Sequence, residues 1–266
     1  MAFTRLTLTF AAASASMDLA AIGAALAARL GVDVQAMVFV ERTLLRLAEL
    51  QQLRRVRLPS GESEAVSPAE LALEFELQGE RLRAAVEAAA REAGIAWSFE
   101  SVADEAAETE VPFAGVIAMA SANGLLGHRR DLVRRLFRRV HGLILLPASG
   151  GVIRRSAILV PERPAGRFLD DALEFARRVR GELPVDVLAA EGADAEARLA
   201  LDRHGMVGLI HPLPTPVDLS TLPTRLPAAI DSLIVAAADF PEHDSPLGRL
   251  LEGVHRPVLL LRALAD

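Results

Sequence analysis

The sequence contains no cysteine in its 266 residues, which excludes disulfides, thiolate metal sites and cysteine catalysis. It also contains no tyrosine and no lysine, so all 29 basic residues are arginine, and aromatic residues make up only 4%. Aliphatic side chains must therefore fill the core, and 52% of the chain is hydrophobic. This composition suits parallel β-strands that are covered by helices on both faces of a sheet.

Long apolar runs are missing as well, because no stretch approaches the roughly 18 residues of a membrane span. The net charge of −6 argues against a general nucleic-acid binder, whose affinity rests on neutralised phosphates. The first residues combine one arginine, an apolar stretch and small residues, as a signal peptide does, but the alternation from Leu6 to Phe10 favours a strand. We therefore expect a cytoplasmic protein with no nucleic-acid or membrane partner.

Strand-like and helix-like patterns alternate along the whole chain. Strands are expected at 3–10, 33–41, 97–102, 115–122, 143–146, 156–161, 185–189, 207–210, 231–237 and 257–261. Helices are expected at 16–30, 68–93, 130–140, 167–180, 194–204 and 246–254. Residues 44–59 read as a short helix or an extended insertion, and residues 60–68 as a polar loop. The alternation predicts right-handed βαβ units and a parallel sheet.

The pattern restarts after ASGG (148–151), and both parts end alike, with VIAMAS and LILLP in one and LIVAAA and PVLLLR in the other. We predict an α/β fold with two tandem flavodoxin-like or Rossmann-like units, residues 1–149 and 152–266, in preference to one large sheet. Each unit would hold a five-stranded parallel sheet with helices on both faces. The last strands of the two units are the expected meeting edge, since an exposed edge invites pairing.

Two stretches carry a resemblance to a known family. SMDLAAIGAALAARLGVDVQAMVFVE (16–41) resembles the first helix and second strand of the universal stress proteins, and DSPLGRLLEGVHRPVLLLR (244–262) resembles their closing signature. The resemblance implies an adenine nucleotide alpha hydrolase-like fold in each half. It also implies a homodimer or, for a tandem chain, an intramolecular pseudo-dimer, with a protein partner that it does not name.

Nucleotide-binding members of that family carry an aspartate at the end of strand one and a G-x2-G-x9-G-S/T loop after strand four. Here the first strand ends in alanines and Ser14, and Gly124 and Gly127 supply only the G-x2-G. An alternative register equates Gly127-His128 with the Gly-Ser, and then most of the loop is missing. We expect no cofactor, with at most residual ATP or AMP binding in a pocket lined by Ser14, Val40, Gly124 and Gly127.

In the second half, Asp244-Ser245 stands where the family has Gly-Ser, and an aspartate there would repel a phosphate. Ser245 and Pro246 have a local explanation, because serine caps a helix and proline occupies its first position. We therefore infer that the second half has lost nucleotide binding.

Six arginines lie between positions 129 and 139. Leu132, Val133, Leu136, Phe137 and Val140 form an apolar helical stripe, which predicts an amphipathic helix with the arginines on its solvated face. Arg129 and Arg130, near the start of this helix, are alternatively candidates for binding an anionic ligand or partner. Nucleic-acid binding is disfavoured by the acidic net charge.

Catalytic signatures are missing: the six histidines show no metal-ligating spacing, and there is no G-x-S-x-G motif. We expect no enzyme and no metal, and a stress-response protein acting through protein contacts. The alternative is an ATP- or AMP-binding regulatory switch in the first half. Slow nucleotide hydrolysis is a third possibility, disfavoured because the acid that would hold a metal is missing.

Overall fold

The computed structural model describes most of the chain. The described residues are 3–12, 17–51, 54–56, 60–103, 115–121, 130–147, 151, 153, 155–160, 167–180, 184–213, 219, 221–222, 226–227 and 229–262. The predicted boundary between the halves therefore falls on residues of which only Gly151 is described.

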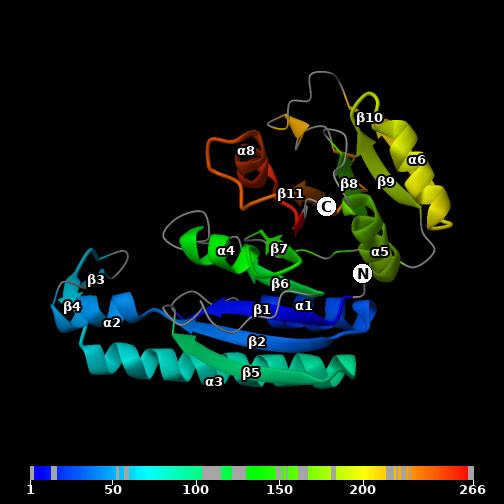
Figure 1. The fold of residues 1–266 in the computed structure, drawn as a ribbon. Coiled ribbons are helices and arrows are strands. Elements are labelled where there is room, and N and C mark those ends of the chain that lie inside the picture. Colours follow the sequence, from blue (N-terminus) through cyan, green and yellow to red (C-terminus); the bar gives the residue numbers. More distant parts are fainter. Residues whose placement is uncertain are drawn as a thin grey trace.

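Ten strands form one sheet in the order β10-β9-β8-β11-β12-β7-β6-β1-β2-β5 (Figure 1). In the first half the strands are β1 (Arg5–Ala11), β2 (Asp33–Val40), β5 (Trp97–Ala103), β6 (Val116–Ser121) and β7 (Gly142–Leu146). In the second half they are β8 (Ser156–Val160), β9 (Val185–Ala189), β10 (Gly208–Pro212), β11 (Ser232–Ala237) and β12 (Val258–Arg262). Within each half all pairings are parallel, and the strand order repeats from one half to the other. The predicted fold class is confirmed.

The halves meet where β7 pairs with β12, and this pairing is antiparallel. Ile144 lies opposite Leu259, and Leu143 lies opposite Leu260. The expectation that the two last strands meet is thus confirmed. Backbone hydrogen bonds continue across this junction, so the two five-stranded units are joined in one ten-stranded sheet.

Helices cover both faces of the sheet. One core contains residues of α1 (Asp18–Leu30), α3 (Pro68–Ala93), α5 (Phe168–Arg180) and α6 (Asp194–Arg203). The core on the opposite face contains residues of α4 (Arg130–Phe137) and α8 (Pro246–Gly253). Alternate residues of a strand point to opposite faces, so Ile117 belongs to the first core and Ala118 to the second. No helix in the described part of the chain is long and apolar enough to cross a membrane.

The segment between β2 and α3 differs from its prediction. After α2 (Arg42–Glu49), β3 (Arg54–Val56) pairs antiparallel with β4 (Ser63–Ala65), so the expected polar loop contains a strand. All six residues of this pair are exposed, and hence no apolar alternation marked them. Figure 1 shows the pair beside α2, at the end of the molecule where α3 begins.

Side chains also join the halves beside the sheet. Phe3 packs edge-on against Phe175 of α5 with ring centroids 5.9 Å apart, and the Arg178 guanidinium donates to the Leu30 carbonyl at 3.0 Å. Nε2 of the buried His141 lies 3.3 Å from a carboxylate oxygen of Asp171. Burial raises the pKa of Asp171, but interactions led by His141 outweigh it and hold that pKa below its ordinary value.

Candidate functional site

The nucleotide pocket predicted in the first half falls mainly on residues that are not described. Ser14, Gly124, Gly127 and Arg129 lie outside the described residues. Val40 is the last residue of β2 and is partly exposed at the carboxyl edge of the sheet. Arg130 begins α4, but its side chain is not described. The structure therefore places two of the six candidate residues, and whether all six come together stays a prediction.

The corresponding place in the second half is the loop 238–245, which connects β11 to α8. The Ser245 hydroxyl accepts a hydrogen bond from the Gly248 N–H at 3.0 Å and donates to the Glu242 carbonyl at 2.6 Å. Pro246 occupies the first position of the helix. The predicted cap is confirmed, and it satisfies one of the amides that a helix start leaves free.

Gly248 lies against the backbone of this same loop. A Cβ atom at Gly248 would lie 2.0 Å from the Glu242 carbonyl oxygen and 2.8 Å from that of His243. The loop thus folds back on the first turn of α8, at the place where a phosphate would approach the helix in a nucleotide-binding member of this fold. Its backbone occupies the space that glycine provides there.

Acidic residues of the loop are paired with Arg134 of α4 and with Arg138, which directly follows that helix. Arg138 makes two hydrogen bonds to the Asp239 carboxylate, 3.2 Å from Nε and 2.8 Å from Nη2. Arg134 forms an ion pair with Glu242 and lies 3.9 Å from Asp239. The hydrogen bond from Arg138 holds the pKa of Asp239 below its ordinary value. These arginines lie on the solvated side of the helix, as its periodicity predicts, and Arg134 and Arg138 also pair there with acidic residues of the loop.

The opposite face of α4 matches its prediction. Val133, Leu136, Phe137 and Val140 are buried in the core on this side of the sheet. The ring of Phe137 packs against Phe240 of the same loop, with centroids 6.3 Å apart. Through both faces, α4 of the first half holds the loop before α8 of the second half.

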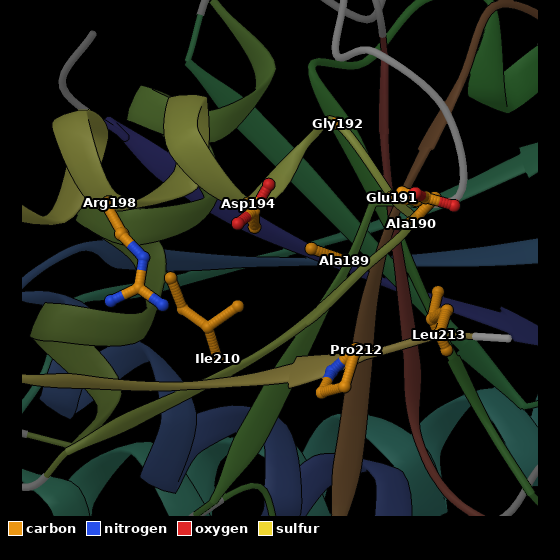
Figure 2. A pocket seen from close by; sticks show the side chains of 9 residues that line it. All are labelled: Ala189, Ala190, Glu191, Gly192, Asp194, Arg198, Ile210, Pro212 and Leu213. Atoms are coloured by element: carbon orange, nitrogen blue, oxygen red, sulfur yellow. The ribbon is translucent and has the colours of Figure 1, made fainter.

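A pocket of about 600 Å³ opens at the carboxyl ends of β9 and β10 (Figure 2). Its lining residues are Ala189, Ala190, Glu191, Gly192, Asp194, Arg198, Ile210, Pro212 and Leu213. No residue predicted to bind a ligand is among them. A signal was present in the sequence EGADAEAR (191–198), where an apolar strand gives way to a glycine and then to a helix with charges of both signs.

A second cluster of charged residues connects three strands, with Arg155 directly before β8, Asp186 near the amino end of β9 and His211 near the carboxyl end of β10. The buried Asp186 accepts hydrogen bonds from Arg155 at 2.8 and 3.1 Å, and Nε2 of His211 lies 3.1 Å from its carboxylate. Burial raises the pKa of Asp186, but hydrogen bonds, led by those from Arg155, keep it below the ordinary value. The three groups satisfy one another, which indicates a structural role. In the described part of the chain, no three acidic or histidine side chains are grouped as a metal site requires.

Comparison with known proteins gives a likeness of fold. No family model matches the sequence, and no curated protein matches it. Among solved structures, the chain is similar to a universal stress protein from Archaeoglobus fulgidus DSM 4304, with a TM-score of 0.61 over 97% of this chain and 96% of that one. Sequence identity is 11%, so the likeness establishes the universal stress protein fold and nothing finer.

Proposed function

We propose that this chain is a non-catalytic protein of the universal stress protein fold that acts through protein contacts and whose second half has lost nucleotide binding. Its two halves would take the place of the two subunits of a dimer. The proposal includes a cytoplasmic location, as expected from the sequence.

One observation carries the proposal. In the loop before α8, the elements that would meet a phosphate are engaged within the chain: Ser245 caps the helix, and the Glu242 backbone lies against Gly248. Asp239 and Glu242 add negative charge at the same place, and arginines of α4 pair with them. A nucleotide would have to displace these contacts and approach carboxylates, both of which disfavour binding.

Exposed leucines on α3 support a role in protein contacts. Leu73 and Leu77 are 54% and 51% exposed. They lie one helical turn apart, so they are neighbours on the helix surface. Adjacent apolar side chains in contact with water mark a surface that gains free energy when a partner covers it.

Isothermal titration calorimetry of the full chain with ATP and with AMP, with and without magnesium, tests the proposal. We expect no binding heat for either nucleotide, and no nucleotide retained through purification. Micromolar binding would contradict the proposal.

The variant Gly127→Arg decides which half is responsible for any binding. If ATP bound and this substitution abolished it, the alternative of a nucleotide-dependent switch in the first half would replace the proposal. Asp244→Asn serves as the matched variant in the second half, and we expect it to bind no nucleotide either, because the loop backbone still fills the space.

A further inference from the structure

Three charged side chains of the pocket at β9 and β10 lack partners. Arg198, Glu191 and Asp194 make no hydrogen bond or ion pair with any other residue that the structure describes. Other arginines of this half are paired, such as Arg178 with Glu174 at 2.7 Å and Arg203 with Asp170 at 3.3 Å. The charges around the pocket are thus available to a molecule from outside.

The arrangement separates the two signs of charge. Asp194 and Arg198 are four residues apart on α6, a spacing that places them on the same face of the helix. Figure 2 shows the Arg198 guanidinium beside Ile210, the Glu191 carboxylate on the opposite side of the pocket, and the Asp194 carboxylate between them. One end of the pocket is therefore cationic and the other end anionic.

Between these ends the lining is apolar. Ala189 is buried, and its small side chain, together with that of Ala190, leaves room above the strand ends. Ile210, Pro212 and Leu213 complete the apolar part. Gly192 has a φ of +88°, a left-handed conformation that lets the loop turn sharply into α6 without a side chain in the opening.

We propose that this pocket binds a small dipolar molecule of the amino-acid class, with a carboxylate at one end and an ammonium group at the other. The carboxylate pairs with Arg198, the ammonium group lies between Glu191 and Asp194, and the hydrocarbon between them covers Ile210. A simple anion would meet two unneutralised carboxylates, and a simple cation would leave Arg198 unpaired. Only a molecule with both charges satisfies all three side chains.

The pocket is offset from the crevice where the strand order reverses. That crevice lies between β8 and β11, whereas the pocket lies two strands further out, between β9 and β10, and its Ala189 ends β9 as Val40 ends β2. Nucleotide binding by itself would not decide the proposal, because only nucleotide binding that Arg198→Gln removes would place a nucleotide in this pocket.

Nuclear magnetic resonance titration of the full chain at low ionic strength tests the proposal. The probes are 4-aminobutyrate, 6-aminohexanoate and 8-aminooctanoate, which vary the distance between the charges, with hexanoate and hexylamine as single-charge counterparts of equal length. We expect at least one dipolar probe to shift the Gly192 amide and the Arg198 Nε–H resonances. Its affinity should be at least tenfold higher than that of hexanoate or hexylamine, and should fall as salt is added.

Variants of α6 locate the binding. Arg198→Gln and Asp194→Asn should each weaken binding of the best dipolar probe by at least tenfold. Arg203→Gln and Asp202→Asn change the same charges on the same helix outside the pocket, and should leave it unchanged. Equal losses in both pairs would overturn the proposal.

Three other results would also overturn it. One is hexanoate binding as tightly as the dipolar probes, which would mean a simple anion site. Another is the absence of a shift at Gly192 with every dipolar probe. The third is AMP binding that Arg198→Gln removes, which would make the pocket part of a nucleotide site.

Discussion

Ser245 and Gly248 are small residues at a helix start, where a phosphate-binding loop would also require small residues. In a nucleotide site, such residues let the backbone approach the phosphates. In this chain, Ser245 caps α8 and Gly248 makes room for the Glu242 carbonyl. Internal packing therefore explains both residues, and their presence does not indicate a ligand.

Substitution of Gly248 by alanine tests this explanation. The added Cβ would collide with the Glu242 carbonyl oxygen 2.0 Å away, and the contact is with backbone, which cannot move like a flexible side chain. We expect the free energy of unfolding to fall by roughly 1–3 kcal/mol, the usual cost of overpacking. Urea denaturation of the full chain measures the change.

Gly79 is the matched control, because it lies inside α3 and a Cβ there would have no neighbour within 4 Å. Gly79→Ala should raise the free energy of unfolding by up to about 1 kcal/mol, through helix propensity alone. A stabilising effect of both substitutions would show that the loop does not pack tightly on α8.

At the scale of elements, burial decides how much the sequence could predict. The central strands are continuous apolar runs, such as Leu143 to Leu146, and these were found close to their observed ends. The start of α3, LALEFEL (71–77), alternates as a strand does, but Leu71, Phe75, Leu82 and Val86 keep helical spacing, and these residues are buried. The exposed β3–β4 pair had no such pattern and was missed.

Pairings between distant elements were beyond the reach of sequence patterns. Arg138 and Asp239 are separated by 101 residues, and their contact depends on how the halves are joined. Helix periodicity placed Arg138 outside the core, which is correct, since its side chain is 57% exposed. Periodicity does not reveal what an exposed side chain touches. The pocket at β9 and β10 is built from neighbouring elements, and it was missed because periodicity also does not show which exposed charges lack a partner.

The contact between α4 and the loop before α8 predicts a measurable titration. In Arg138→Gln the pKa of Asp239 should rise toward the ordinary aspartate value of about 3.9, because the hydrogen bond that lowers it is lost. Because the pKa of Asp239 is lower in the folded state, its ionised carboxylate stabilises the fold at pH values above the pKa that Asp239 has in the unfolded state. This stabilisation is lost as the pH falls through the folded-state pKa of Asp239. Since both groups are exposed, we expect the effect on the free energy of unfolding to be small.

Carboxyl resonances of Asp239, followed from pH 6 to about 2, measure this pKa in both proteins. Arg139→Gln is the neighbouring charge change for comparison, and should move the Asp239 pKa less. An unchanged pKa in Arg138→Gln would show that the contact is absent in solution.

At the scale of the whole molecule, the antiparallel pairing of β7 with β12 makes one sheet from two similar halves. The pairing removes two edges from solvent, and its side chains are buried from Leu143 to Leu146 and from Val258 to Leu261. Unpaired edges of this kind are templates for association. The junction therefore holds the halves together and also protects their strands.

Production of residues 1–149 and 152–266 as separate chains tests the junction. We expect each chain alone to self-associate through its freed edge strand, β7 or β12. A mixture of the two should form a one-to-one complex instead. Size-exclusion chromatography with light scattering distinguishes these states. Two stable monomers that ignore each other would show that the junction contributes little.

The short connection between Leu146 at the end of β7 and Ser156 at the start of β8 has a consequence for the strength of this junction. Tethered partners meet at an effective concentration on the order of millimolar, whatever the concentration of the protein itself. Dilution therefore cannot separate the two halves, and each half always pairs with the other half. In a homodimer a substitution occurs in both subunits and must fit both sides of the interface. In this chain it changes one half only, so the two halves can specialise independently.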